Sequence, residues 1–369
     1  MPIKKLLKIR ARPIGIDLGS AVVKIAQMRN TDDQLELLAA ARVNVPPDCL
    51  NDVKKRRDFL AGRLRKILKD RGFKGRQCIL SIPAADTFVT HIRTAPAPPD
   101  ELEKALRWQL EGKLPFNHND AIIRHMVVGP VQGENEGRQE VIVVAISRQS
   151  AEAYLEMAYS SRLEVAAMNV ESCAIVQCFA RLFRHAEDAH RATLFLDLGQ
   201  TYTQVVISQG PKLVFARNLL FGADQIDKVV SDVLSISVEE ARSYRRRVSD
   251  LTDEAVTDTD RLDEAVNESL KSAVAEITKC LRYYESMFPS NPVERAIFLG
   301  GQARDTHLCK GIARHLHLPS QVGDPLVKIK KAEGAGITPE DGPDFRKAQP
   351  EWVVAVGLSL GVKKEAYAA

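Results

Sequence analysis

Apolar and polar positions alternate on both sides of a short glycine-containing stretch near the start of the sequence. Before this stretch, Ile14 and Ile16 occupy alternate positions, and after it Val23 and Ile25 do the same. Alternation with a period of two indicates strands that bury one face. The pattern therefore predicts two strands joined by a tight turn, with Asp-Leu-Gly-Ser at residues 17–20.

The same pattern recurs in the second half of the chain. An apolar run at residues 192–198 ends in Asp-Leu-Gly, and a polar stretch and a second apolar run follow it. Two such hairpins indicate a duplicated unit. A dinucleotide-binding fingerprint would lead from a strand into a helix and would carry G-x-G-x-x-G. Because a strand follows each turn here, the Rossmann interpretation is excluded.

The residue types in the two turns suit phosphate and magnesium. Glycine at positions 19 and 199 lets the backbone turn tightly and bring its N–H groups close to phosphate oxygens. Asp17 and Asp197 stand at the hairpin mouths, where a carboxylate can hold Mg²⁺ through water molecules. Two ordinary hairpins with an Asp-x-Gly turn are the structural alternative. Hydroxyl groups that can add hydrogen bonds come from Ser20, Thr201 and Thr203.

Other periodicities organise the rest of the chain. Residues 84–165 alternate strand-like and helix-like patterns and form an expected insertion with its own small core. Residues 225–288 are mostly helical, and their last part, 262–288, carries a long apolar stripe. A predicted strand then ends in Gly300 and Gly301, where a nucleoside can approach the backbone.

Composition narrows the function further. At 369 residues the chain exceeds the size of about 250–300 at which a single core stops growing, so two lobes are expected. A net charge of +4 is too weak to indicate nucleic acid. The six cysteines contain no C-x-x-C pair, which disfavours zinc sites and a disulfide framework. The longest apolar stretch, at 352–362, is too short to span a bilayer.

Two basic stretches stand out within this balance. Residues 54–57 are Lys-Lys-Arg-Arg at the start of a predicted helix, and we interpret them as a solvated helix face. The first twelve residues are also basic and are interpreted as a solvated tail, with contact to anionic lipid as the alternative.

The order of these motifs resembles the actin-like ATPase superfamily. D-L-G-S, "NVES", D-L-G-Q-T, "LGGQAR" and a closing apolar helix follow one another as in that superfamily. Within it, the chain is most similar to the type IV pilus assembly protein PilM family, a relative of FtsA. Three further segments also carry this resemblance. They are residues 102–129, 141–172 and 215–226.

The resemblance implies an α/β, two-lobed, actin-like (ribonuclease H-like) fold with an inserted small α+β subdomain. The first lobe would comprise 13–83, 166–190 and 350–363, and the insertion 84–165. The second lobe would comprise 191–224 and 289–349, with 225–288 as its helical subdomain.

The resemblance also implies a site for ATP and Mg²⁺ between the lobes. Asp17 and Asp197 would hold the metal, and Asn169 and Glu171 would position an attacking water. The implied nucleotide-binding residues are Asp17, Gly19, Ser20, Asp197, Gly199, Thr201, Thr203, Arg245, Gly300 and Gly301.

The chain departs from the family pattern at four positions. Arg242 stands where Glu reaches the ribose, and Arg245 replaces a Lys. Gln302 stands where a third small residue is usual, and Asn169 where the residue is often acidic. Most of these departures fall on the adenosine side of the expected site.

The implied function is that of a cytoplasmic scaffold with at most slow ATPase activity. It would be held at the inner membrane by docking the cytoplasmic N-terminal tail of a PilN-like protein on the insertion and its cleft with the first lobe. Self-association is a further expectation, and nucleic acid is not an expected partner. A nucleotide-independent adaptor and a small-molecule kinase of the same superfamily are the alternatives, as is a related secretion system in place of the pilus.

Overall fold

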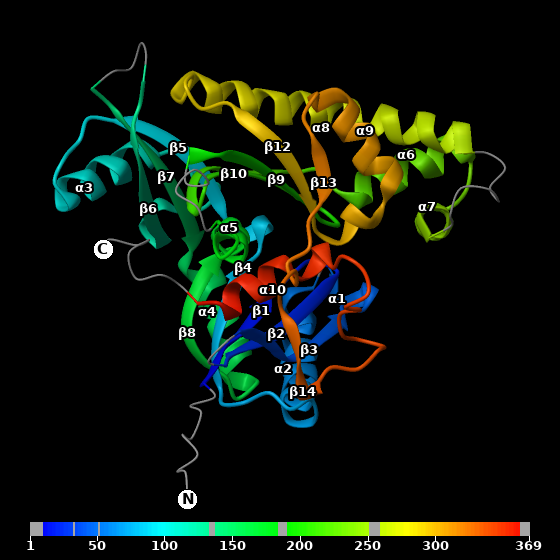
Figure 1. Cartoon of the computed structure of the whole chain (residues 1–369). Coiled ribbons are helices and arrows are strands. Elements are labelled where there is room, and N and C mark those ends of the chain that lie inside the picture. Colours follow the sequence, from blue (N-terminus) through cyan, green and yellow to red (C-terminus); the bar gives the residue numbers. More distant parts are fainter. Residues whose placement is uncertain are drawn as a thin grey trace, which may run out of the picture.

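The structure is a computed structural model that describes residues 10–31, 34–50, 52–132, 137–183, 190–250 and 259–361. Two large sheets form the two lobes, and a third, smaller sheet lies beside them (Figure 1). Within the described residues, no helix combines the length and the apolar character that crossing a bilayer requires.

The first lobe is built on a six-stranded sheet in the order β14-β3-β2-β1-β4-β8. Its first three strands form an antiparallel meander, and β4 and β8 continue the sheet in parallel. The edge strand β14 joins β3 in parallel from far along the chain. The bounds are β1 Arg10–Asp17, β2 Val22–Asn30, β3 Leu35–Asn44, β4 Gln77–Ile82, β8 Glu164–Val170 and β14 Lys330–Gly336.

Helices cover both faces of this sheet. On the outer face α2 (Val53–Asp70) buries Leu60, Leu64 and Ile67 against the strands, with α4 (Arg148–Ser160) beside it. On the other face lie α5 (Glu171–Ala180) and α10 (Val353–Ser359), which also join the core of the second lobe. The outer helix α2 therefore lies on the side of the lobe that faces away from the second lobe (Figure 1). A short helix, α1 (Pro47–Leu50), precedes it.

The second lobe repeats the topology of the first. Its five-stranded sheet has the order β11-β10-β9-β12-β13, in which an antiparallel meander is again continued by two parallel strands. The bounds are β9 Ala192–Leu198, β10 Thr203–Gln209, β11 Lys212–Leu219, β12 Val293–Leu299 and β13 Ser320–Val322. The helices of this lobe are α6 Ala223–Leu234, α7 Val238–Asp250, α8 Thr259–Met287 and α9 Thr306–Leu316.

The inserted unit has its own small core. Its sheet has the order β5-β7-β6, and helix α3 buries Leu102, Leu106 and Leu110 against it. The bounds are β5 Phe88–Thr94, α3 Pro99–Leu110, β6 Ala121–Pro130 and β7 Gln139–Ser147. The next helix, α4, packs with α2 and belongs to the first lobe's core, so this core ends at β7.

The two-lobed actin-like fold predicted from the sequence is confirmed. The described elements also place β14, within the range expected for the second lobe, on the edge of the first sheet. The expected domain boundaries as a whole stay a prediction. The helix expected at 170–184 is shorter, and the expected closing helix is α10 preceded by a 3₁₀ turn at Pro350–Trp352.

Candidate functional site

The two hairpins place equivalent residues opposite each other. Asp17 ends β1 and pairs in register with Lys24 of β2. Asp197 lies near the end of β9 and pairs in register with Gln204 of β10. Lys24 Nζ donates to Asp17 Oδ2 at 3.0 Å, whereas the side chain of Asp197 has no hydrogen bond or ion pair with a described residue. The first carboxylate thus has a cationic partner and the second does not.

The charged side chains of the two hairpins interact electrostatically. Burial, followed by the negative charge of Asp17, raises the pKa of Asp197 to about 7, and Lys24 opposes this with a smaller lowering effect. Burial, followed by the charges of Asp17 and Asp197, holds the pKa of Glu171 well above its usual range. Burial alone would lower the pKa of Lys24, but Asp17 and Asp197 outweigh it and raise the pKa. The site therefore gathers three carboxylates around one lysine.

Glycines let the backbone close around these carboxylates. A Cβ at Gly19 would lie 2.7 Å from Val22 O, and a Cβ at Gly199 would lie 2.6 Å from Tyr202 O. Gly300 has a φ of +85°, and a Cβ there would lie 2.3 Å from Asp197 Oδ1. A side chain at any of these positions would displace the hairpin or its carboxylate.

The neighbouring glycine, Gly301, adjoins open space instead of close contacts. A Cβ at Gly301 would meet nothing within 4 Å, and this residue begins the 3₁₀ turn Gly301–Arg304 that follows β12. Open space therefore adjoins the backbone directly beside the second hairpin, where the sequence predicts the nucleoside.

The residues expected to position water lie at the start of α5. Glu171 is its first residue, and Gln204 Nε2 donates to Glu171 Oε2. Asn169 lies near the end of β8, two residues before Glu171, and its side-chain oxygen accepts a hydrogen bond from Val170 N at 2.9 Å. Glu171 is therefore bonded to the second hairpin, while Asn169 bonds the backbone at the entry into the helix.

The three predicted hydroxyl groups are placed differently from one another. Ser20 lies at the tip of the first hairpin, and its backbone oxygen accepts from Arg56 of α2. Thr201 Oγ1 donates to Asp224 Oδ2 at 2.9 Å, so it braces the start of α6. Thr203 is buried, and its hydroxyl has no partner among the described residues. The structure brings Ser20 and Thr201 to the hairpin tips and buries Thr203 in the sheet.

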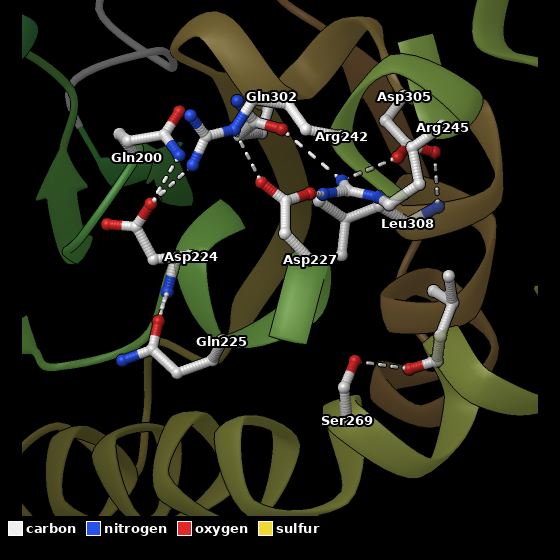
Figure 2. Close-up of polar contacts among 12 residues, drawn as sticks. Gln200, Asp224, Gln225, Asp227, Arg242, Arg245, Ser269, Gln302, Asp305 and Leu308 are labelled. Atoms are coloured by element: carbon white, nitrogen blue, oxygen red, sulfur yellow. Dashed lines mark hydrogen bonds and ion pairs between the residues drawn. The ribbon is translucent and has the colours of Figure 1, made fainter. Parts of the chain in front are cut away.

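The arginines on the expected adenosine side are held by carboxylates. Arg245 is buried and bonds Asp227 at 2.5 Å and Asp305 at 2.8 Å. Arg242 bonds the other oxygen of Asp227 at 2.9 Å and reaches Asp224 at 3.2 Å. Figure 2 shows Asp227 between the two guanidinium groups.

This ion-pair network links the adenosine side to the second hairpin. Asp224 also accepts from Thr201 and from Gln200 Nε2, and Gln302 Oε1 accepts from Arg245 at 3.3 Å (Figure 2). Arg245, predicted as a nucleotide contact, therefore serves here as the centre of a buried structural network. Gln302, a departure from the family pattern, belongs to the same network.

Three residues of the site escaped the sequence analysis. Lys24 and Gln204 stand at the same distance along the chain after Asp17 and Asp197, and this repeated spacing is the signal that could have found them. Arg56 donates to the backbone oxygens of Gly19, at 2.8 Å, and Ser20. No spacing along the chain indicates that contact, because it depends on how α2 packs against the sheet.

The residues present fit a hydrated magnesium ion better than a directly ligated one. Among the described residues, no three His, Cys, Asp or Glu side chains converge closely enough to hold a metal ion. The excess of buried negative charge nevertheless favours a cation between Asp17 and Asp197. Mg²⁺ keeps several waters and takes few protein ligands when phosphates are present.

A separate cavity of about 280 Å³ lies away from these carboxylates. Arg12 and Arg181 line it, and they donate to backbone oxygens of Leu360 and Pro325, respectively. These hydrogen bonds hold the backbone at the end of a helix and in a loop, so we assign the cavity a structural role.

Known proteins resemble this chain in sequence and in fold. The family model described as "Type IV pilus assembly protein PilM" matches residues 15–363. A solved structure described as "PilM-PilN type IV pilus biogenesis complex" is 20% identical, with a TM-score of 0.75, over 95% of this chain and 98% of that one. The ethanolamine utilization protein EutJ from Carboxydothermus hydrogenoformans is 14% identical, with a TM-score of 0.52, over 98% of this chain and 90% of that one.

Proposed function

The chain belongs to the type IV pilus assembly protein PilM family, and from this premise we propose that it is an ATP-binding scaffold that docks an inner-membrane partner. The pair of facing hairpins, with Asp17 and Asp197 coupled through Lys24, is the observation that carries the nucleotide part of the proposal. The protein would act on the cytoplasmic side of the inner membrane and would be held there by its partner.

In this proposal the backbone N–H groups around Gly19 and Gly199 bind phosphate oxygens, and Lys24 adds a positive charge. Asp17 and Asp197 hold a hydrated Mg²⁺, which offsets the repulsion between their carboxylates and the phosphates. The open backbone at Gly301 receives the nucleoside. In the same proposal Glu171 orients a water and accepts its proton, and the raised pKa of this carboxyl, caused chiefly by burial, supports that role.

Binding of Mg-ATP tests this part of the proposal. We expect isothermal titration calorimetry to detect binding to the wild type and at least a tenfold weaker affinity for Asp17→Ala. The exposed Asp100→Ala on α3 is the matched control and should bind as the wild type does. Equal affinity of all three proteins would remove the hairpins from the binding site.

The partner part of the proposal rests on the likeness to a PilM that was solved with PilN. We propose that the N-terminal tail of a PilN-like protein binds where the insertion meets the first lobe, beside the turn Ala84–Asp86. There Tyr154 of α4 donates to Asp86, so the two units already touch through side chains.

A peptide with the sequence of that tail should bind the wild-type chain at micromolar or lower concentration. Tyr154→Ala should weaken binding, whereas Tyr159→Ala, an exposed tyrosine on the same helix, should leave it unchanged. Failure of the peptide to bind in calorimetry would contradict the docking proposal and leave the nucleotide proposal untouched.

One observation favours a second candidate, an adaptor of the same fold that works without nucleotide. Lys24 already neutralises Asp17, and Arg242 and Arg245 are already held by carboxylates on the adenosine side. An adaptor would bind the partner peptide with the same affinity in the presence and absence of Mg-ATP, and it would show no heat of nucleotide binding.

A further inference from the structure

Positive charge is concentrated on one part of the first lobe. Residues 53–76, which comprise α2 and the loop after it, contain eleven Lys and Arg but only two Asp. The whole chain has a net charge of only +4, so the rest of the chain is net negative. The weak overall charge therefore conceals a strongly polarised surface.

The arginines of α2 are mostly engaged within the protein. Arg56 donates to the first hairpin, Arg57 pairs with Glu156 of α4 at 2.8 Å, and Arg65 donates to Ser160 O. These contacts fix the helix on the lobe, and they remove three charges from the set that is open to a partner.

Five further basic residues of α2 are exposed, and none has a hydrogen bond or ion pair from its side chain to a described residue. We call them the α2 basic face. Its members are Lys54, Lys55, Arg63, Lys66 and Lys69. The acidic side chains closest to them in sequence are Asp52, Asp58 and Asp70. Asp52 caps the start of the helix by accepting from Lys55 N, Asp58 lies 3.7 Å from Arg57, and Asp70 ends the helix.

We propose that the α2 basic face binds an anionic phospholipid surface. The face runs along an eighteen-residue helix, about 27 Å in length, on the outer side of the first lobe (Figure 1). This side faces away from the second lobe, so a flat surface can approach the helix without contacting that lobe.

The chemistry of the face favours a membrane over an acidic protein. Four of its five members are lysines, which act as flexible point charges, whereas specific carboxylate recognition prefers the planar fork of arginine. Gly62 interrupts the exposed side of the helix, and a Cβ there would meet nothing within 4 Å. The face is therefore open and shallow, as binding to a lipid surface without fixed geometry requires.

An aromatic side chain lies at the border of the face. Arg65 donates to Ser160 O, so the end of α4 lies beside the second half of α2. The preceding residue on α4, Tyr159, is 61% exposed. Tyrosine is favoured at membrane–water boundaries because it is apolar along its ring and polar at its tip.

Sedimentation with vesicles tests the proposal on the full-length chain. Vesicles of phosphatidylglycerol and phosphatidylethanolamine should carry the protein down at low salt, and vesicles of phosphatidylcholine alone should not. Each lysine near an anionic bilayer contributes about a fivefold gain in partitioning. The variant Lys54→Gln/Lys55→Gln/Lys66→Gln/Lys69→Gln should therefore lose at least tenfold in binding.

A matched variant removes the same charge elsewhere. Lys228→Gln/Lys271→Gln/Lys279→Gln/Lys310→Gln lies on helices of the second lobe and should sediment with the vesicles as the wild type does. A thermal melt of each variant verifies that it is folded. Raising the salt concentration should weaken binding of the wild type, because the attraction is screened.

Three results would overturn the proposal. The wild type could fail to bind the anionic vesicles, or both variants could lose binding equally, which would make the effect one of net charge. The α2 variant could also keep vesicle binding and lose binding to polyglutamate, which would assign the face to an acidic protein partner. Binding of Mg-ATP and of the partner peptide, measured in parallel, distinguishes these failures from failure of the proposed function.

Discussion

Asp17 and Asp197 occupy equivalent places in two hairpins, but their surroundings give them different properties. Lys24 holds Asp17 in an ion pair, whereas the position opposite Asp197 is the neutral Gln204. Gln204 donates to Glu171 and adds no positive charge. Among the described residues, no cation is therefore paired with Asp197, and burial, followed by the charge of Asp17, raises its pKa to about 7.

This raised pKa predicts a specific dependence of stability on pH. Because folding disfavours the ionised form of Asp197, its contribution to stability is lost as pH rises from about 4 to about 7. Asp197→Asn should thus gain stability relative to the wild type between pH 5 and pH 8, on the order of 2 kcal/mol. Urea unfolding of both proteins at the two pH values measures the gain.

Asp344→Asn is the control for that measurement. Hydrogen bonds from Arg346 lower the pKa of Asp344 to about 2, so this carboxylate stays ionised from pH 5 to pH 8. Its variant should differ from the wild type by the same amount at both values. A gain for Asp197→Asn that does not change with pH would contradict the charge assigned to the site.

Arg245 carries a second prediction at the residue scale. Removal of its guanidinium in Arg245→Ala leaves Asp305 without its cation and leaves Asp227 with Arg242 alone, and we expect a loss of about 3 kcal/mol in the free energy of unfolding. Denaturant titration measures it. The same truncation at the exposed Arg346 should cause no measurable change. A small effect at Arg245 would instead indicate that the network relaxes around the gap.

Individual elements show what the sequence could and could not predict. The two hairpins were predicted correctly because alternation of apolar residues around Asp-Leu-Gly is a local signal. The edge strand β14 was not, since its sequence, residues 330–336, is charged and glycine-rich and pairs only because the first sheet offers an open edge. The extent of the insertion, 84–165, stays a prediction, and the packing of α4 on α2 is a long-range contact that no local pattern indicates.

The candidate site residues also divide into those that a local pattern indicates and those that depend on long-range packing. The hairpin residues Asp17, Gly19, Asp197 and Gly199 could be predicted because each belongs to a turn with a local sequence pattern, and the fold brings them together at one site. The ion pairs of Arg242 and Arg245 depend instead on how α6, α7 and α9 pack, so neither composition nor spacing along the chain could place them.

Helix α10 depends on glycine for its close approach to the first sheet. A Cβ at Gly15 of β1 would lie 2.1 Å from Ala355 O, which is impossible without separating the two elements. Gly15→Ala should therefore lower the free energy of unfolding by about 2–3 kcal/mol. Thermal and urea unfolding test this expectation.

Gly62 provides the opposite case on α2. It lies inside a helix, and a Cβ there meets nothing, so Gly62→Ala should raise stability by about 0.5–1 kcal/mol. If both alanine variants changed stability in the same direction, steric contact would not be what distinguishes the two glycines.

At the scale of the whole molecule, the insertion is bonded to the second lobe. Glu140 of β7 is fully buried, and its Oε1 lies 2.8 Å from His91 Nδ1 and accepts from Tyr283 of α8 at 2.9 Å. His91 also stacks on Phe215 of β11, and Arg93 lies over the Tyr283 ring. The second lobe thus supplies, through Tyr283, one of the two hydrogen-bond partners that Glu140 Oε1 has among the described residues.

Removal of Glu140 should loosen this contact. We expect Glu140→Ala to cost about 3 kcal/mol and to speed amide hydrogen exchange in β5 and β11, because His91 and Tyr283 lose a hydrogen-bond partner and Arg93 loses its ion pair. Glu103→Ala, on an exposed pair of α3, should alter neither quantity. Unchanged exchange in β11 would show that the insertion is held by other contacts.

The bonding of the insertion has a mechanical consequence. Two bodies joined by a hinge can open freely, but a third body attached to both turns the arrangement into a closed linkage. Here the insertion is continuous with the first lobe near Ala84 and is also bonded to the second lobe, where Asn218 donates to Ala84 O and Thr87 O. Any movement of the two lobes relative to each other must consequently also move or strain the insertion.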